Sequence, residues 1–418
     1  NGLKKDLLIK SAEKYKTPQY VLHEDMLKKR AASFIRTFRK YMPRSEFFYA
    51  FKCNDLPYLV KSLKEEGFNA DVAGIYELML AIKLGFKKIV FNGPGKGKEE
   101  LKLAIENGVI INADSLDEIK AIISLSPKNK VKLGIRINPS ENISQSWSKF
   151  GISPEDLPKA LRLIKKDKRI ELKGLHFHCS WNLDPSRYVK SIDIIGGLIS
   201  KNRISLDFLD IGGGFYPEDT AELHKFSLKN DMIKAIREVR DIEADLDPHK
   251  FSLEGVEPLE TFAEEISKAL KKNKISCRIF LEPGRFIAAH STSILMKVIA
   301  VKKDRIITDA GVNLVGDYRF EEYSFAPIIN LSHPSFGIKR KHIYGPLCDP
   351  SDLWGYSYYG KGIKKGDILA VLHQGAYTFC CAWRFIKPIA PYVVEHKKDL
   401  LLAKGKESFK DRYNNCIF

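Results

Sequence analysis

A chain of 418 residues is too long for one ordinary domain and suits two domains, or a barrel of roughly 250 residues with an addition. Its composition, 44% hydrophobic and 29% charged, is close to the globular average, and no apolar run of about 18 residues could cross a bilayer. The net charge of +17 would suit nucleic-acid binding, but the lysines lie mainly on amphipathic stretches such as 61–64 and 271–274, which favours a hydrated lysine-rich surface. An alternative that stays open is attraction of an anionic cofactor or substrate to part of this surface.

The cysteines lack the spacing of metal ligands, and their odd number cannot all pair within one chain. They are Cys53, Cys179, Cys277, Cys348, Cys380, Cys381 and Cys416. At the amino-terminal end, no basic start, apolar stretch and small-residue cleavage site occur in order. We therefore predict reduced thiols, a cytoplasmic protein, and no nucleic-acid or membrane partner.

Short apolar runs alternate with amphipathic stretches of helical period from residue 44 to about 286, a pattern typical of repeated β/α units and a parallel sheet. The expected strands are 45–51, 69–73, 88–92, 108–112, 131–137, 172–178, 206–211 and 278–282. Eight such units favour a closed (β/α)8 barrel over an open sheet. Helix-start signals support this register: the capping residue Ser153 precedes a first-turn proline and two acidic residues.

A second domain is expected after residue 287, where strand-like runs such as 293–301 and 367–372 are broken by glycine and proline turns. The opening segment 17–22 is also strand-like and precedes the barrel, so it can join the carboxy-terminal β domain. We predict a (β/α)8 TIM barrel with a carboxy-terminal all-β domain. The predicted parts are an amino-terminal segment 1–26 that joins the β domain, the barrel 27–287 and the β domain 288–418.

Unusual polar and glycine residues fall where the expected strands end, which is where the functional residues of such barrels gather. Lys52 ends the first strand within the apolar run 49–54, where it either reaches solvent or carries out chemistry. The seventh strand ends in the glycines 212–214, which form either a tight turn or a loop whose backbone N–H groups approach a phosphate. The eighth strand ends in Glu282-Pro-Gly-Arg285, which is either a structural ion pair or part of a site.

Two histidines, His176 and His178, end the sixth strand and are expected to point to the same side because strand side chains alternate. Paired histidines suggest a metal site. No carboxylate or cysteine constellation in the sequence completes one, so we predict that the protein holds no metal.

Seven motifs in a fixed order carry a resemblance to a known family. They are Tyr-Ala-x-Lys, Asp-Val-Ala-Gly, His-x-His, Gly-Gly-Gly, Glu-Pro-Gly-Arg, Gly-Pro-x-Cys-Asp and Gly-Ala-Tyr. The chain resembles, over nearly its whole length, the fold-type III pyridoxal-5'-phosphate (PLP) decarboxylases, the diaminopimelate and ornithine decarboxylase family. The resemblance implies an enzyme that removes the α-carboxylate of an amino acid with PLP as its cofactor.

By this resemblance, Lys52 is the Schiff-base lysine that holds PLP, and Glu282 faces the pyridine nitrogen. A carboxylate there keeps the nitrogen protonated, so that the ring accepts the electron pair left by departing carbon dioxide. His178 matches the histidine that stacks on the ring, while Asp71 and Glu77 match acidic residues near it.

The family pattern also implies a set of residues that bind the cofactor and its phosphate. These are Gly212, Gly213, Gly214, Gly284, Arg285, Tyr377 and a serine after the histidine. Here the chain departs from the pattern, because the family usually shows His-x-Gly-Ser whereas residues 178–181 read His-Cys-Ser-Trp. Ser180, the expected phosphate ligand, therefore sits one place early.

The segment 344–349 resembles the one that the family inserts into the active site of a partner subunit. Cys348 would return a proton to the α-carbon after decarboxylation, and Asp349 and Tyr377 would contact the substrate. The alternative for Cys348 is a small buried hydrophobic residue. The family pattern thus implies a homodimer with shared active sites.

Diaminopimelate decarboxylases typically carry an Arg-Pro-x-Leu-Tyr segment early in the β domain, and residues 309–318 lack it. Asp349 resembles the ornithine-type branch, although the acidic cluster of that branch is not evident. We therefore favour a larger or conjugated amino acid as the substrate, as in siderophore, polyamine or antibiotic biosynthesis. The alternative is a diaminopimelate, ornithine or lysine decarboxylase of primary metabolism.

Two alternatives come from other classes. An amino-acid racemase of the same barrel class needs a tyrosine base facing Lys52, and the Gly-Pro-Leu-Cys-Asp segment favours decarboxylation instead. An inactive regulatory homologue would be expected to lose Lys52, Glu282 or the glycine run, all of which are present.

Overall fold

The computed structural model describes residues 4–125, 130–139, 149–180, 182–217, 255–316, 326–414 and 416–417. These residues fall into two compact units. One contains the described residues of 28–217 and 256–287, and the other contains 4–27, Gly255 and the described residues from 288 onward.

The unit that begins at residue 28 is a barrel. Within the described chain, its eight parallel strands follow one another around the barrel in sequence order, and the last pairs with the first. The strands are β2 (Ser45–Ala50), β3 (Asn69–Val72), β4 (Ile89–Phe91), β5 (Ile110–Ala113), β6 (Val131–Arg136), β7 (Ile170–His176), β8 (Phe208–Asp210) and β9 (Arg278–Leu281). Each overlaps an expected strand, and the predicted (β/α)8 barrel is confirmed.

The inside of the barrel has an aromatic layer next to a polar layer. Phe208 and Asp210 lie two residues apart on β8 and therefore project to the same side, and Phe280 and Glu282 have the same spacing at the end of β9. The rings of Phe208 and Phe280 stack with centroids 4.3 Å apart, and both belong to a buried cluster with Phe48. The carboxyl ends of the strands thus carry polar side chains directly above a packed aromatic floor.

Helices cover the outside of the barrel. Along α7 (Leu157–Lys165), Leu157, Ala160 and Ile164 are buried at helical spacing, which turns one face toward the strands. As the sequence predicted, the Ser153 side chain accepts a hydrogen bond from a backbone N–H at the start of this segment. The other helices are α2 (Glu24–Tyr41), α3 (Pro57–Glu65), α4 (Ile75–Lys83), α5 (Lys98–Glu106), α6 (Leu116–Ser124), α8 (Ser186–Asn202), α10 (Leu259–Lys272) and α11 (Arg285–Ala288).

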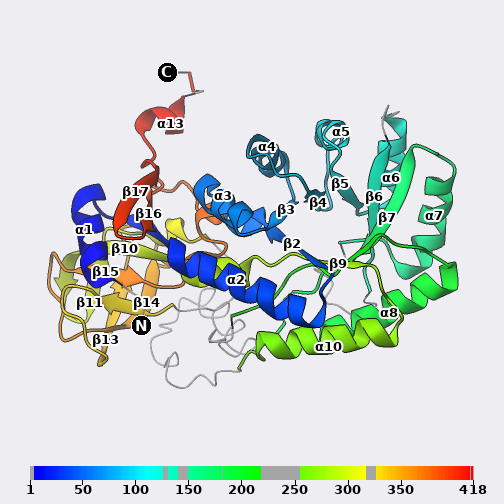
Figure 1. Ribbon diagram of the computed structural model, residues 1–418. Helices are drawn as coiled ribbons and strands as arrows, with labels where there is room; N and C mark the ends of the chain where they lie inside the picture. Colours follow the sequence, from blue (N-terminus) through cyan, green and yellow to red (C-terminus); the bar gives the residue numbers. More distant parts are fainter. Residues whose placement is uncertain are drawn as a thin grey trace. The chain divides into compact units, whose positions relative to one another are not determined.

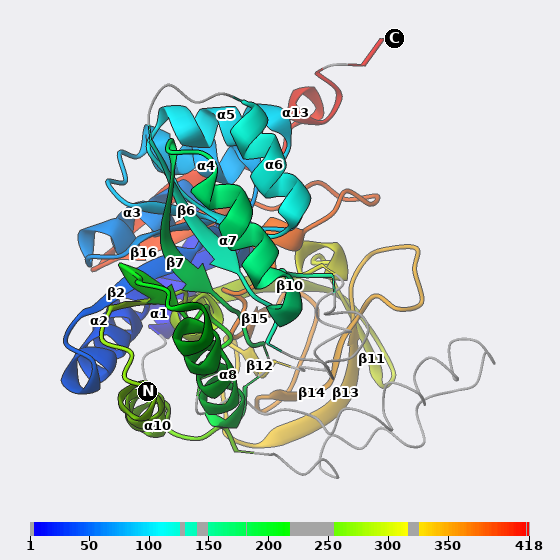
Figure 2. The same ribbon diagram turned by 90° about the vertical axis from the view of Figure 1, so that its right-hand side faces the viewer.

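Neighbouring helices of the barrel also contact one another. Figure 1 shows α8 beside α10, and Asp193 on α8 accepts hydrogen bonds from Lys272 (2.9 Å) and Asn273 (2.6 Å) at the end of α10. Figure 2 shows α6 and α7 side by side along the outside of β6 and β7.

The other unit is built on a sheet that, among the described residues, has nine strands in the order β11-β13-β14-β12-β15-β10-β1-β16-β17. The strands are β1 (Gln19–His23), β10 (Thr292–Lys302), β11 (Arg305–Thr308), β12 (Ile328–Asn330), β13 (Ile338–Tyr344), β14 (Leu353–Tyr359), β15 (Ile368–Val371), β16 (Tyr392–His396) and β17 (Asp399–Lys404). β1 lies between antiparallel β10 and parallel β16, so the amino-terminal strand is part of this sheet. The predicted carboxy-terminal β domain is confirmed.

One hydrophobic core of this unit joins the sheet to the first helix, α1 (Lys5–Tyr15). Leu8 and Ala12 on α1 pack with Val21, Leu295 and Val393. A short helix, α13 (Phe409–Tyr413), follows the last strand. In the part of the chain that the structure describes, no helix combines the length and the apolar composition needed to cross a membrane.

Candidate active site

Lys52 lies directly after the first barrel strand. β2 ends at Ala50, and a short 3-10 turn, η1 (Phe51–Cys53), carries the lysine. Its Nζ is 3.2 Å from Oδ2 of Asp71 on β3. The lysine side chain is 36% exposed, whereas that of Asp71 is 1% exposed. A buried carboxylate therefore holds a lysine whose side chain is only partly buried.

Burial and charge act in opposite directions on this pair. Burial lowers the pKa of Lys52, but the carboxylates of Asp71 and Glu282 outweigh it and raise the pKa above its usual value. Burial raises the pKa of Asp71 to about 6, with Glu282 adding to the rise and Lys52 opposing it. At neutral pH the pair is therefore an ammonium and a carboxylate.

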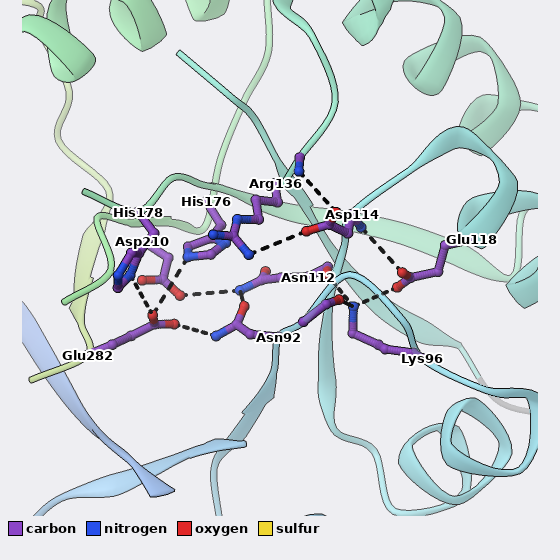
Figure 3. Close-up of polar contacts among 12 residues, drawn as sticks. Asn92, Lys96, Asn112, Asp114, Glu118, Arg136, His176, His178, Asp210 and Glu282 are labelled. Atoms are coloured by element: carbon purple, nitrogen blue, oxygen red, sulfur yellow. Dashed lines mark hydrogen bonds and ion pairs between the residues drawn. The ribbon is translucent and has the colours of Figure 1, made fainter. Parts of the chain in front are cut away.

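Asn92 joins two acids of the site. It follows β4, and its Nδ2 donates to Oδ1 of Asp71 (2.7 Å) and to Oε1 of Glu282 (2.5 Å). Its Oδ1 accepts from Asn112 (2.9 Å), whose Nδ2 also donates to Oδ2 of Asp210 (3.3 Å). Figure 3 shows this run of side chains from Glu282 through Asn92 and Asn112 to Asp210. The neutral amides thus fix the carboxylates without adding charge to a buried site.

Glu282 follows β9 and lies beside His176, which ends β7, and His178, which lies two residues beyond that strand. Oε2 of Glu282 is 3.7 Å from Nε2 of His176 and 3.8 Å from Nδ1 of His178, so the histidines face the same side, as expected. Burial lowers the pKa of His176, and it lowers that of His178 to about 4. Burial alone would raise the pKa of Glu282, but the neighbouring His176 and Lys52 hold it below its usual range. The site therefore keeps a carboxylate beside neutral imidazoles at pH 7.

In the described chain, His176, His178 and Glu282 also form a group whose ligand atoms lie within 4.8 Å of one another. The expectation that no carboxylate completes a histidine site was wrong, because Glu282, which follows a strand far along the chain, lies beside both histidines. Such a donor set occurs in zinc sites. Nδ1 of His178, however, already accepts a hydrogen bond from the backbone N–H of Gly213 (3.2 Å), which occupies the lone pair that a metal would need. The absence of a metal stays a prediction.

Two charged pairs support the polar layer from the neighbouring strands. Nη1 of Arg136 is 3.4 Å from Oδ1 of Asp114, and Nζ of Lys96 is 2.8 Å from Oε1 of Glu118 (Figure 3). The Lys96 side chain is 1% exposed and also donates to two backbone oxygens at 2.8 and 2.9 Å. Its three donors are satisfied, which gives this buried lysine a structural role and leaves Lys52 as the lysine for chemistry.

The glycine run 212–214 passes too close to its neighbours for any side chain. Gly212 and Gly214 have φ values of +69° and +96°, which favour glycine. A Cβ on Gly213 would lie 2.2 Å from the backbone oxygen of Glu282, and one on Gly214 would lie 2.0 Å from that of Cys179. The glycines therefore let the loop close over the ends of two neighbouring strands.

Two amides of this run already have acceptors. The N–H of Gly212 donates to Oδ1 of Asp210 (3.0 Å), and the N–H of Gly213 donates to Nδ1 of His178 (3.2 Å). These amides hold side chains of the site in place. The phosphate contact that the resemblance implies for the run stays a prediction. It is now expected at Gly214, because the N–H groups of Gly212 and Gly213 already donate to Asp210 and His178.

Gly284 and Arg285 follow β9 toward the loop that carries Lys52. A Cβ on Gly284 would lie 2.8 Å from Cβ of Cys53, so this glycine allows the two loops to meet. The Arg285 guanidinium lies over the ring of Tyr216, 5.0 Å from its centroid, just beyond the glycine run. The alternative of a Glu282–Arg285 ion pair does not describe this arrangement, because Glu282 faces the barrel interior.

The remaining predicted residues lie in the β unit. Cys348 is exposed, so its alternative interpretation as a buried hydrophobic residue was wrong. Oδ1 of Asp349 accepts hydrogen bonds from the backbone N–H and the hydroxyl of Ser351, both at 2.9 Å. Tyr377 has a positive φ of +57°, which is unusual for a residue with a side chain. Their roles toward a substrate stay predictions.

Comparison with known proteins decides the family. Residues 29–289 match the model of the pyridoxal-binding domain of the pyridoxal-dependent decarboxylases. The chain belongs to this family. A diaminopimelate decarboxylase from Aquifex aeolicus is 27% identical over 95% of this chain and 91% of its own length, and one from Methanocaldococcus jannaschii is 28% identical over 96% and 92%. The crystal structure of the diaminopimelate decarboxylase from M. jannaschii has a TM-score of 0.82 at 25% identity, covering 98% of this chain and 94% of that one.

The site of this pyridoxal-dependent decarboxylase fits its cofactor. Lys52 offers an amine to the cofactor aldehyde, and Glu282 offers a buried anion that suits a protonated pyridine nitrogen. The glycine run supplies a loop that no side chain obstructs. The protein is therefore a PLP-dependent carboxy-lyase acting on an amino acid.

Sequence reasoning missed Asn92, Asn112 and Asp210, and did not assign His176 a place in the site. Asn92 and Asn112 each lie at the end of a barrel strand, as Lys52 and Glu282 do. A polar residue that closes an otherwise apolar strand was therefore a usable signal. The pairing of Asn92 with both Asp71 and Glu282 depends on barrel closure, which sequence spacing does not reveal.

Glu77 gives the site a pH-dependent contribution to stability. Burial raises the pKa of Glu77 to about 7 from its ordinary 4.5, against the hydrogen bond that its Oε2 accepts from the backbone N–H of Ala73 (2.7 Å). The folded protein then binds more protons than the unfolded chain between these values. This contribution to the free energy of unfolding is fully present below pH 4.5 and is lost as the pH rises through about 7. The loss is at most about 3 kcal/mol.

We expect Glu77→Gln to remove this dependence, because a glutamine can still accept the Ala73 hydrogen bond but carries no charge. Urea unfolding of the cofactor-free protein at pH 5, 6, 7 and 8 measures the free energy of unfolding of both proteins. Their difference should shift in favour of the variant with rising pH, and the exposed Glu65→Gln serves as the control. A constant difference would contradict the raised pKa.

Proposed function

We propose that the protein is a diaminopimelate decarboxylase of primary metabolism, which removes one α-carboxylate of diaminopimelate and releases lysine. The observation that carries the proposal is end-to-end similarity: relatives of this name align with 94–96% of this chain in seven of eight cases. The M. jannaschii and Helicobacter pylori enzymes of this name have been crystallised with L-lysine.

This proposal replaces the preference for a conjugated amino acid drawn from the sequence. That preference was based on the absence of Arg-Pro between residues 309 and 318, and residues 317–325 lie outside the described part of the chain. The absence of one motif excludes one way of binding a distal carboxylate. It does not exclude binding by a cation placed elsewhere by the fold.

The residues of the barrel divide the work of decarboxylation among them. When bound, PLP supplies a conjugated ring that accepts the electron pair left by departing carbon dioxide. Glu282 holds a proton at the pyridine nitrogen, and Asn92 holds Glu282 in place at 2.5 Å. Lys52 provides the amine that anchors the cofactor, with Asp71 orienting it at 3.2 Å. His178, which is neutral, offers a flat apolar face without repelling a protonated ring.

Carbon dioxide release against a panel of amino acids tests the substrate. We expect diaminopimelate, with its stereoisomers tested separately, to give the highest kcat/KM, about 10⁴ M⁻¹s⁻¹ or more. Ornithine, lysine and amino acids with an acylated side-chain amine complete the panel. A higher value for a conjugated amino acid would overturn the proposal and restore the specialised branch.

We infer further that the active site is shared between two chains, with Lys52 from one and Cys348 from the other. The inference is based on the resemblance of the segment 344–349 to the family's inserted segment, and on the exposure of Cys348. In its own unit Cys348 lies on the surface, where a partner subunit can reach it.

Mixing variants tests the shared site. Lys52→Ala and Cys348→Ala are each expected to be nearly inactive, whereas their heterodimer contains one intact site and should recover about half the activity of the unmodified dimer. The matched control mixes Lys52→Ala with Glu282→Gln, which damages both barrels and should recover nothing. Activity that stays absent in confirmed Lys52→Ala/Cys348→Ala heterodimers would show that the two residues act within one chain or that Cys348 is dispensable.

A further inference from the structure

His178 is held by hydrogen bonds at both ring nitrogens. Its Nδ1 accepts from the backbone N–H of Gly213 (3.2 Å), and its Nε2 lies 3.0 Å from Oγ of Ser180. A backbone N–H can only donate, so Nδ1 carries no hydrogen. In a neutral imidazole the hydrogen is then on Nε2, so in this hydrogen bond Nε2–H is the donor and Oγ of Ser180 is the acceptor.

The segment that carries Ser180 is itself fixed by the barrel. Nη1 of Arg187, in the first turn of α8, donates to the backbone oxygen of Ser180 (2.9 Å). Nδ2 of Asn182 donates to the backbone oxygen of Cys179 (3.1 Å) and to that of Gly214 (3.2 Å). The serine hydroxyl therefore approaches the imidazole from a backbone that is anchored on both sides.

The opposite side of the ring is equally restricted. A Cβ on Gly212 would lie 2.6 Å from Nδ1 of His178, so the imidazole already fills the space beside the glycine loop. The ring has no room to turn toward that loop. Rotation of the ring away from the loop would break the hydrogen bonds with Gly213 and Ser180.

We propose that Ser180, which stands where the family pattern has glycine, is a positioning residue that fixes the ring plane of His178 for contact with the cofactor, while the Gly213 N–H sets the tautomer. A glycine at this position has no side-chain oxygen that could accept a hydrogen bond from Nε2–H. Accepting that bond uses a lone pair of Oγ and not the hydroxyl hydrogen, so the role is compatible with the phosphate contact implied for Ser180. The consequence for catalysis is based on the proposed function, whereas the hydrogen bond itself is not.

The cofactor-free protein provides a readout that does not depend on activity. In ¹H–¹⁵N spectra with ¹⁵N-labelled histidine, we expect a slowly exchanging Nε2–H signal that His178→Gln abolishes, which assigns it. Ser180→Ala and Ser180→Gly should speed the exchange of this proton with water at least about tenfold, because an N–H that has lost its acceptor opens to solvent. Ser180→Thr, which keeps the hydroxyl, should restore slow exchange, and the exposed Ser186→Ala should leave it unchanged.

The loaded enzyme adds a second readout. We expect Ser180→Ala to lower kcat by about 3- to 10-fold, which corresponds to the loss of one neutral hydrogen bond. The KM for the amino acid should stay unchanged, and Ser180→Thr should recover the kcat. An Nε2–H signal that exchanges equally slowly in Ser180→Ala would overturn the proposal, whatever the substrate proves to be. Changed exchange without decarboxylation of any tested amino acid would leave the positioning role intact and refute the proposed function instead.

Discussion

Lys52→Ala is expected to lower decarboxylation by about 10²- to 10⁴-fold, because it removes both the covalent anchor of the cofactor and the amine nearest the reacting carbon. The structure singles out this lysine among the buried ones. The three hydrogens of the Lys96 amine are donated to Glu118 and two backbone oxygens, whereas Lys52 contacts the buried Asp71 carboxylate and its side chain is 36% exposed. Turnover assays with saturating PLP distinguish loss of decarboxylation from weaker binding of the cofactor.

Borohydride reduction followed by peptide mapping locates the covalent attachment independently of turnover. The pyridoxyl group should be found on Lys52 and should be absent from Lys52→Ala. Lys88→Ala is the matched control, because Lys88 pairs with Glu46 at an exposed position of the barrel and should keep both label and activity. A label on any other lysine would reject the assignment.

Glu282→Gln is expected to lower kcat by about 10²- to 10³-fold while leaving PLP bound. The side chain changes little in shape, and a glutamine oxygen can still accept the hydrogen bond from Asn92. The change removes a negative charge that His176 and Lys52 stabilise in a buried site. Without that charge, a proton on the pyridine nitrogen loses its counter-ion, and the ring becomes a weaker electron acceptor.

The same substitution at the other end of the barrel provides the control. Glu46, near the start of β2, pairs with Lys88 and Arg278, and Glu46→Gln should leave kcat unchanged. The absorption of bound cofactor reports retention of PLP in both variants. Near-normal kcat for Glu282→Gln at saturating substrate would make Glu282 structural.

The barrel could be predicted from sequence because short, largely apolar segments alternate with stretches of helical period. Lys52 and Glu282 could also be recognised at the ends of the strands, since a charged residue that closes an apolar run is conspicuous. The neutral partners were less visible. Asn92 and Asn112 each lie at the end of an apolar run but carry no charge, and they become part of a site only when the folded barrel brings their side chains to Asp71 and Asp210.

The substrate was the least predictable feature, for a related reason. Decarboxylation requires a fixed set of groups around the cofactor, whereas the distal end of a substrate can be bound by any suitably placed cation or anion. The missing Arg-Pro was therefore weak evidence against diaminopimelate. Ser180 was misplaced relative to the family pattern in sequence, and its contact with His178 at 3.0 Å could be seen only once the loop was folded.

The aromatic layer beneath the polar layer fills the barrel interior with packed side chains. Phe208 and Phe280 fill its width so closely that a methyl group on Gly174 would come within 2.3 Å of the Phe208 ring. A ligand therefore reaches the polar layer from the carboxyl ends of the strands, where Lys52 lies. A bound product has to leave by the same end before the next substrate can enter, so the rate of its release is an upper limit on turnover.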